Sequence, residues 1–437
     1  MSSIAEKVPG CKLAAERQAF CGFLQSLLIS AAMKGAHPRI TLLGNNSGRN
    51  LGDAAIMSSI LESLSRQLPD AEFYVPTIAP QWVESHYAGR YRVRGVNVWP
   101  WTLSVRLLGL PTLLCFARSD VALICDGIIF GKRLFNPAFN YLITLVFLVP
   151  LARLLKCRVA CFNCGIGPFP SRISRLLARW TMNGCDLITM RERDSIQLAQ
   201  DLGVTKPIEL TGDSAFINPV SPRERALEIC RSHGIEADKP ILGVNVTSYF
   251  DMWLADHERV EPGTDLISVV ADGVSRARQR IGEALQPVVF STQPMDDAVC
   301  GRLAGLLGAP LIRNRDYLSH DIQAVMRECA LLVGMRFHAL VLASAVRAPI
   351  VGLIYAPKVR GFLRLLNSER YGLELAGLSA ELLADRLCEA WNSRQELQAV
   401  QQRIIADLRD GAERASSLLC SRFFPEKHQP AAVPAGA

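Results

Sequence analysis

The chain of 437 residues is longer than one ordinary hydrophobic core supports, so we expect two domains of common size. Hydrophobic residues make up 49% of the sequence and charged residues 20%, a globular composition that excludes a disordered chain. The net charge of +7 is mildly basic, and no window concentrates Lys and Arg as a nucleic-acid-binding arm does, so we expect no nucleic-acid partner.

Residues 1–37 are interpreted as an N-terminal extension. Its charged residues precede a moderately apolar stretch, and the order of charged, apolar and small residues typical of a secretory signal is missing. The 13 cysteines are scattered and odd in number, which indicates reduced thiols. We therefore expect a cytoplasmic location.

The first domain is predicted over residues 38–216. Continuous apolar runs that are typical of buried strands alternate there with helical patterns. The expected strands are residues 39–43, 72–75, 121–125, 158–162 and 187–190, with helices from 53 and from 194 to 202.

Residues 141–152 form the most apolar stretch of this domain. The stretch is shorter than the roughly 20 residues that a helix needs to span a bilayer. A buried helix is the preferred interpretation. Shallow contact with the inner face of the membrane is the alternative.

Two prolines within residues 217–222 mark the expected linker, and the second domain is predicted over residues 223–424. Its expected strands are residues 240–246, 286–291, 331–334 and 349–354, with helices at 266–285, 297–307 and 337–344. The Pro/Ala-rich residues 425–437 are expected to be a disordered tail. Both halves predict an α/β fold of doubly wound, Rossmann-like domains that face a cleft.

The densest polar cluster follows two late strands. Arg336 and His338 open a helix, and Lys358 follows the next strand. A helix start favours an anion, an arginine fork matches a carboxylate or phosphate, and a histidine transfers protons near neutral pH. A helix-capping arginine and a core histidine are the alternative, but three such residues at adjacent strand ends favour a binding site.

Two further clusters follow strands of the first domain. Residues 44–53 form a glycine-rich turn that ends in Asp53, which is also a candidate N-cap. Residues 165–169 form a Gly-x-Gly-Pro turn, and Arg191 stands at another strand end. Neither the first turn nor residues 127–132 match a nucleotide-binding loop, so we expect no nucleotide site there.

Five of these motifs, in this order, resemble the polysaccharide pyruvyl transferase family. They are Gly44 with Asn50-Leu-Gly-Asp53-Ala-Ala-Ile56; Gly165-Ile-Gly-Pro-Phe169; Arg191-Glu-Arg-Asp-Ser195 with Leu202-Gly203-Val204; Gly212-Asp213-Ser-Ala-Phe216; and Gly334-Met-Arg336-Phe337-His338-Ala339 with Tyr355-Ala-Pro-Lys358. The likeness runs from about Arg39 to about Leu366. One departure is that the family often has consecutive glycines where this chain has Asp126-Gly127-Ile128-Ile129.

The resemblance implies an architecture similar to the two-domain GT-B glycosyltransferases. It implies phosphoenolpyruvate as donor substrate, a saccharide or lipid-linked oligosaccharide as acceptor, and ketal formation on a polysaccharide or its precursor. The sequence has no evident metal-binding cluster, and cationic side chains could replace a metal, so we expect no cofactor or metal. The catalytic residues that we predict are His338, Arg336 and Asp53. The predicted substrate-binding residues are Arg191, Lys358, Gly52, Asn50, Gly127, Gly167 and Phe337.

The chemistry of phosphoenolpyruvate explains this choice. Protonation of its methylene carbon makes C2 cationic, a sugar hydroxyl attacks C2, and phosphate leaves. Arg336 and Arg191 suit the carboxylate and phosphate, with Lys358 sharing that task, His338 suits the proton donor or a phosphate ligand, and Asp53 is a candidate base. A GT-B glycosyltransferase that uses a nucleotide sugar, and a non-catalytic carbohydrate-binding relative, are the alternatives.

Overall fold

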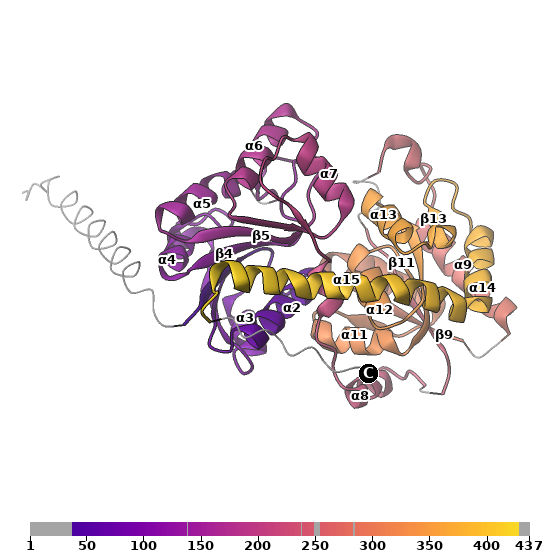
Figure 1. The fold of residues 1–437 in the computed structure, drawn as a ribbon. Coiled ribbons are helices and arrows are strands. Elements are labelled where there is room, and N and C mark those ends of the chain that lie inside the picture. Colours follow the sequence, from indigo (N-terminus) through magenta and orange to yellow (C-terminus); the bar gives the residue numbers. More distant parts are fainter. Residues whose placement is uncertain (1–36, 138, 237, 249–253, 283–284, 428–437) are drawn as a thin grey trace, which may run out of the picture.

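The computed structural model describes residues 37–427 except residues 138, 237, 249–253 and 283–284. These residues form two parallel sheets, one in each half of the chain, with helices on both faces of each sheet (Figure 1). The predicted fold class of two doubly wound α/β domains is confirmed. The predicted extension and tail lie outside the described residues, apart from His37 and residues 425–427.

The first sheet has the strand order β3-β2-β1-β4-β5-β6-β7. Its strands are β1 (Arg39–Leu43), β2 (Glu72–Thr77), β3 (Arg92–Asn97), β4 (Val121–Cys125), β5 (Arg158–Cys164), β6 (Leu187–Met190) and β7 (Glu209–Leu210). Its helices are α2 (Leu51–Gln67), α3 (Pro80–Tyr87), α4 (Leu110–Arg118), α5 (Leu142–Leu154), α6 (Arg172–Asn183) and α7 (Arg193–Asp201). The five predicted strands are confirmed. The two edge strands β3 and β7 were not predicted, because β3 lacks a continuous apolar run and β7 has only two residues.

The second sheet has the order β10-β9-β8-β11-β12-β13. Its strands are β8 (Ile241–Asn245), β9 (Gln286–Ser291), β10 (Leu311–Arg313), β11 (Cys329–Gly334), β12 (Ile350–Ile354) and β13 (Gly372–Glu374). Its helices are α8 (Arg223–Ser232), α9 (Leu266–Ile281), α10 (Asp297–Leu307), α11 (Ser319–Arg327), α12 (Phe337–Ala345), α13 (Pro357–Leu365), α14 (Ala380–Asn392) and α15 (Arg394–Phe423). The four predicted strands are confirmed, since each coincides with a strand at the centre of the sheet.

The last helix, α15, runs across both domains (Figure 1). Its C-terminal half packs against α2, where the Ser416 and Ser63 hydroxyls lie 2.8 Å apart and Arg66 donates to Glu413 at 2.6 Å. The predicted linker falls between α8 and the short 3-10 helix η2 (Ser214–Ile217), while α15 returns to the first domain. The domain limits stay a prediction.

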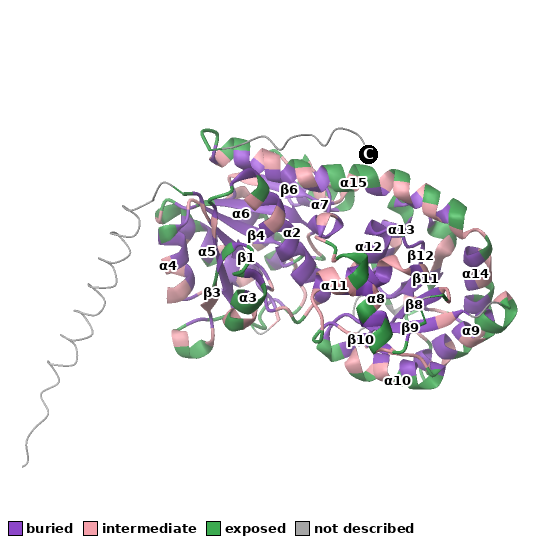
Figure 2. Cartoon of the chain, turned by 90° about the horizontal axis from the view of Figure 1, so that it is seen from below, coloured by how far each residue is buried: buried purple, intermediate pink, exposed green. Residues whose placement is uncertain are grey.

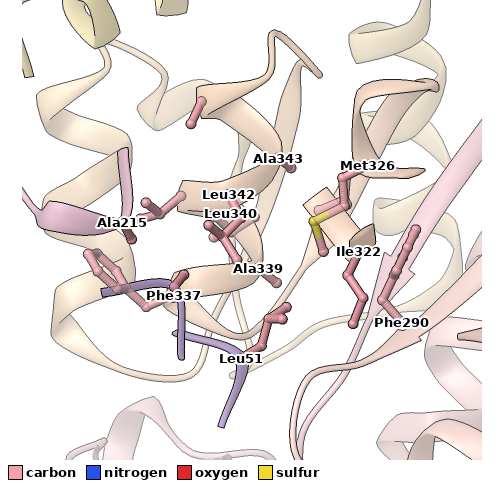
Figure 3. Packing of buried hydrophobic residues seen from close by; sticks show 14 of the residues in the cluster. Leu51, Ala215, Phe290, Ile322, Met326, Phe337, Ala339, Leu340, Leu342 and Ala343 are labelled. Carbon is pink, nitrogen blue, oxygen red and sulfur yellow. The ribbon is translucent and has the colours of Figure 1, made fainter. Parts of the chain in front are cut away.

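A shared apolar core joins the two domains near their facing helix starts. Figure 3 shows Leu51 of α2, Ala215 of η2 and Phe337 of α12 close together, and all three side chains are buried. Hydrogen bonds also cross the junction, because Leu51 N–H donates to the Thr292 carbonyl at 2.9 Å and the Asn314 amide donates to the Gly48 carbonyl at 3.0 Å. These contacts hold the start of α12 against the start of α2.

The apolar stretch predicted over residues 141–152 is α5, which buries one side in the first domain. Within the described residues, no helix has both the length and the apolar character needed to cross a membrane. Figure 2 shows the central strands buried and the outer helices with alternating buried and exposed residues, which is the pattern of two covered sheets.

Candidate active site

The predicted site residues come from loops at the carboxyl ends of the central strands. Asp53 lies in the first turn of α2, after β1, and Arg191 follows β6. Arg336 and His338 follow β11, and Lys358 follows β12. Because α2 faces α12 across the domain junction, residues that are nearly 300 positions apart in the sequence share one crevice.

His338 lies directly against α2. A Cβ atom built on Gly52 would come 2.0 Å from His338 Nδ1, so only glycine leaves room for this ring at position 52. On its other side, His338 Nε2 lies 3.6 Å from Asp213 Oδ2, which is ion-pair distance but beyond a hydrogen bond. The ring is therefore held between the two domains and is partly accessible.

Asp213 also pairs with Arg191, whose Nη1 donates to Oδ2 at 2.7 Å, and both side chains are buried. Burial alone would raise the pKa of Asp213, but the Arg191 guanidinium and the His338 ring outweigh it and hold this pKa below its usual range. The neighbouring Gly212 lets α15 approach, since a Cβ there would lie 2.1 Å from the Leu408 carbonyl oxygen. The Gly-Asp motif thus fixes one carboxylate beside Arg191 and His338.

Two more carboxylates meet at Asn45. Its side-chain amide donates to Asp53 at 2.7 Å, and its backbone N–H donates to Asp126 at 3.1 Å. The Tyr141 hydroxyl donates to the Asn45 side-chain oxygen at 3.3 Å. Asp126 has a φ of 60°, so the left-handed backbone after β4 directs it into this cluster.

Burial raises the pKa of both carboxyl groups. For Asp53 the positive charges of His338, Lys358 and Arg336 and the hydrogen bond from Asn45 oppose the rise without cancelling it. The pKa of Asp126 lies well above its usual value because burial is reinforced by the negative charge of Asp53. The two carboxyl groups therefore bind a proton more readily than exposed aspartates do.

Arg336 is oriented by a buried carboxylate. Its Nε and Nη2 donate to the two oxygens of Asp296 at 2.8 and 3.0 Å. Asp296 is fully buried, and its Oδ1 also accepts a hydrogen bond from Thr247 at 3.0 Å. Asp296 therefore engages the fork on one side, Tyr355 also interacts with the guanidinium, and the side chain remains partly exposed.

Lys358 is exposed at the start of α13. Its Nζ lies 5.7 Å from the centre of the Phe337 ring and 5.9 Å from that of Tyr355. The guanidinium of Arg191 lies 4.9 Å from the same Phe337 ring. Phe337 thus packs between two cationic side chains, at cation–π distance from both.

The remaining predicted residues shape the surrounding loops. Asn50, not Asp53, is the N-cap of α2, because its side chain accepts from Gly52 N–H at 2.9 Å. This corrects the alternative that Asp53 caps the helix. Gly127 is exposed beside the Gly165 carbonyl, and Gly167 has a φ of 86° and donates to the Ile129 carbonyl at 2.8 Å. The roles of Asn50, Gly127 and Gly167 in substrate binding stay predictions.

Sequence reasoning missed four polar residues of the site: Asn45, Asp126, Asp213 and Asp296. Asn45 lies in the glycine-rich turn of residues 44–53, and Asp126 directly follows the predicted strand 121–125. Asp213 belongs to the Gly-Asp motif that resembles the family. Asp296 stood just before a predicted helix, where an aspartate is usually a local capping residue.

The described part of the chain contains no group of three or more His, Cys, Asp or Glu side chains arranged to hold a metal ion. The expectation that the protein needs neither metal nor cofactor stays a prediction.

Comparison with solved structures defines the class of fold. UDP-GlcNAc 2-epimerase from Methanocaldococcus jannaschii superposes with a TM-score of 0.56 at 12% identity, covering 88% of this chain and 99% of that one. UDP-GlcNAc 2-epimerase from Neisseria meningitidis, bound to UDP-GlcNAc, gives 0.53 at 12% identity, covering 89% and 100%. A glycosyltransferase from Rickettsia africae gives 0.53 at 9% identity, covering 90% and 100%. At such identities the likeness shows the GT-B fold alone.

Comparison with curated protein sequences finds no match. The family model of polysaccharide pyruvyl transferases matches residues 50–357, most of the chain. The matched range begins at the cap of α2 and ends at the start of α13, so it spans both halves of the crevice. The chain belongs to the polysaccharide pyruvyl transferase family and is a transferase.

Proposed function

We propose that this transferase takes its pyruvyl group from phosphoenolpyruvate and adds it to hydroxyls of a saccharide that serves polysaccharide formation at the cell envelope, such as an exopolysaccharide or its precursor. The observation that carries the proposal is that cationic side chains and a buried carboxyl group share one crevice. Arg336, Lys358 and His338 lie near enough to Asp53 to lower its pKa, but burial keeps this pKa raised. This arrangement offers anion binding and proton transfer at the same place.

The donor has two anionic groups, a carboxylate and a phosphate. Arg336 has a preset orientation and matches either group through its remaining donors. Lys358 is exposed and adds a mobile point charge, while Arg191 is buried and committed to Asp213. We therefore assign the direct contacts to Arg336 and Lys358, and to Arg191 the placement of Asp213 beside His338.

The reaction adds one proton to the methylene carbon of phosphoenolpyruvate. The cationic C2 then accepts the oxygen of a sugar hydroxyl, which loses its proton. A second hydroxyl replaces the phosphate and closes the ketal, and its proton leaves with the phosphate. Asp126 shares Asn45 with Asp53, and its raised pKa makes it a candidate acid beside His338, the predicted proton donor. Asp53 is the candidate base.

We place the reaction in a reducing compartment such as the cytoplasm. The described cysteines are all free thiols, and all but Cys388 are buried. A saccharide precursor, lipid-linked or free, would be the acceptor there.

The test is release of phosphate from phosphoenolpyruvate by the purified protein in the presence of a panel of saccharides. Thermal shift with phosphoenolpyruvate and with UDP-GlcNAc runs beside it, because structures of this fold bind that nucleotide sugar. Acceptor-dependent phosphate release, or a shift with phosphoenolpyruvate alone, supports the proposal. A thermal shift with UDP-GlcNAc and none with phosphoenolpyruvate would contradict the proposal and favour a nucleotide sugar as the donor substrate.

A further inference from the structure

The surface of helices α5 and α6 has an unusual composition. Residues 127–185 contain no Asp or Glu. They contain eight basic residues: Lys132, Arg133, Arg153, Lys156, Arg158, Arg172, Arg175 and Arg179. The segment thus has a charge of +8 in a chain of net charge +7. The rest of the chain sums to a charge of −1, so this segment accounts for the net positive charge of the protein.

Helix α6 is apolar on two opposite faces. Its inner face packs into the domain through Ala178 and Met182, which are fully buried. Its outer face carries Ile173, Leu176 and Trp180 at a spacing of i, i+3 and i+7, exposed by 53%, 63% and 47%. A stripe at this spacing lies on one side of a helix, so the outer stripe is a continuous feature of the surface.

Helix α5 extends this stripe. The two helices lie next to each other (Figure 1), and Gly184 at the end of α6 lies against Val149 of α5. Phe147 and Leu154 of α5 are also more than half exposed. We call the five exposed residues Phe147, Leu154, Ile173, Leu176 and Trp180 the outer apolar stripe. Its flanks carry exposed arginines: Arg153, Arg172, Arg175 and Arg179.

We propose that the outer apolar stripe docks on an anionic phospholipid bilayer. Apolar side chains and a tryptophan on one face, with arginines beside them and no acidic residue within residues 127–185, are features of helices that lie in the membrane interface. A second copy of the chain is disfavoured, because a symmetric contact would place the same arginines opposite one another. Nucleic acid is disfavoured, because it offers nothing that buries the aliphatic side chains.

The turn before α6 links this helix to the loops of the crevice. The turn that precedes α6 holds Gly167, whose N–H bonds to Ile129, and Gly131 N–H bonds to the Pro168 carbonyl at 2.8 Å. A Cβ on Gly131 would come 2.5 Å from Ser174 Cβ, in the first turn of α6. The loops that hold Gly127 and Gly167 are therefore joined to the buried side of the first turn of α6. On the proposed function, this position suits an acceptor saccharide whose lipid carrier remains in the bilayer.

The test is co-flotation of the full chain with vesicles. We expect binding to mixtures of phosphatidylcholine and phosphatidylglycerol, weakened by salt, and little binding to phosphatidylcholine alone. Leu176→Ser should weaken binding about tenfold, since it removes an apolar side chain from the interface. The control Leu306→Ser changes a leucine on α10 that is also more than half exposed, and it should have no effect.

A second pair of variants tests the charges. Arg175→Gln with Arg179→Gln should lower vesicle affinity by about fivefold for each arginine. The control pair Arg278→Gln with Arg403→Gln, exposed on α9 and α15, should leave it unchanged. Circular dichroism checks that every variant is folded.

Equal binding of all variants, or no binding of the wild type to anionic vesicles, overturns the proposal. So does conversion of a dimer to a monomer by Leu176→Ser, which would assign the stripe to a second copy. Vesicle binding needs no substrate, and phosphate release with a water-soluble acceptor needs no vesicle. Failure of the docking proposal and failure of the proposed function are therefore distinguishable.

Discussion

The ring of His338 rests on the backbone of Gly52, where a side-chain carbon would approach Nδ1 to 2.0 Å. The two residues belong to different domains, since Gly52 lies in the first turn of α2 and His338 in the first turn of α12. Gly52 is predicted from the sequence to bind substrate, and in the structure it packs against the ring of the predicted catalytic residue His338. The catalytic geometry thus depends on how closely the two helix starts approach.

Gly52→Ala should displace His338 and lower turnover by at least about a hundredfold, because catalysis is sensitive to misplacements of about 1 Å. Overpacking should also cost about 1–3 kcal/mol of stability. Phosphate release and the thermal unfolding midpoint measure the two effects. The control is Gly305→Ala on α10, where a Cβ meets no atom within 4 Å. Full turnover in Gly52→Ala would contradict the placement of His338 in the reaction.

Lys358→Ala should abolish most of the transfer activity while leaving the fold unchanged. The side chain is exposed, so its loss should alter stability by no more than about 0.5 kcal/mol. Removing a cation that meets the donor should lower kcat/KM for phosphoenolpyruvate by about a hundredfold or more. Lys206→Ala, an exposed lysine of the first domain, is the matched control. Similar kinetics for both variants would remove Lys358 from the donor site.

Asp296→Asn tests how Arg336 is oriented. Breaking this buried pair should destabilise the protein by about 3–5 kcal/mol, because the partly buried guanidinium loses its counter-charge. The KM for phosphoenolpyruvate should rise as Arg336 loses its orientation. Asp385→Asn removes one of the two carboxylate partners of Arg280, in an exposed pair at 2.7 Å, and should have little effect. Comparable unfolding midpoints for the two variants would show that the buried pair contributes no more to stability than the exposed pair.

The ion pair of Arg336 with Asp296 makes alanine a poor choice of variant at position 336. Truncation of Arg336 to alanine would leave the carboxylate of Asp296 buried without its main partner. Loss of activity would then mix unfolding with loss of donor binding. Arg336→Gln keeps a donor toward Asp296 and is the sharper probe.

Asp126→Asn should alter the pH dependence of stability. A carboxyl group whose folded pKa lies above its unfolded value of about 3.9 stabilises the fold at low pH, and this contribution is lost as pH rises toward the folded pKa. The wild type should therefore lose stability relative to Asp126→Asn as the pH rises from about 4 toward neutrality. Thermal unfolding midpoints of both proteins across this range measure the difference.

Asp213→Asn is the control of opposite sign. The folded pKa of Asp213 lies below its unfolded value, so its charge stabilises the fold above that value and the stabilisation is lost as pH falls toward the folded pKa. This variant should be less stable than the wild type at neutral pH, and the gap should close in acid. Parallel pH profiles for the two variants would contradict the charges assigned to the crevice.

The amino-acid sequence by itself determined the architecture and the neighbourhood of the site. Apolar runs such as residues 121–125 and 350–354 are local signals, because a strand covered on both faces must be apolar throughout. Polar residues that follow such runs collect at one edge of a parallel sheet. Arg336, His338 and Lys358 could therefore be assigned to one crevice before their contacts were known.

Only the tertiary structure decided which groups meet across the crevice. The pairing of Arg336 with Asp296, the joint contact of Asn45 with Asp53 and Asp126, and the return of α15 to α2 all depend on how two domains dock. The exposure of the outer apolar stripe of α6 likewise depends on tertiary packing. Residues 173, 176 and 180 have the spacing of any amphipathic helix, and nothing local says that the domain already covers the opposite face.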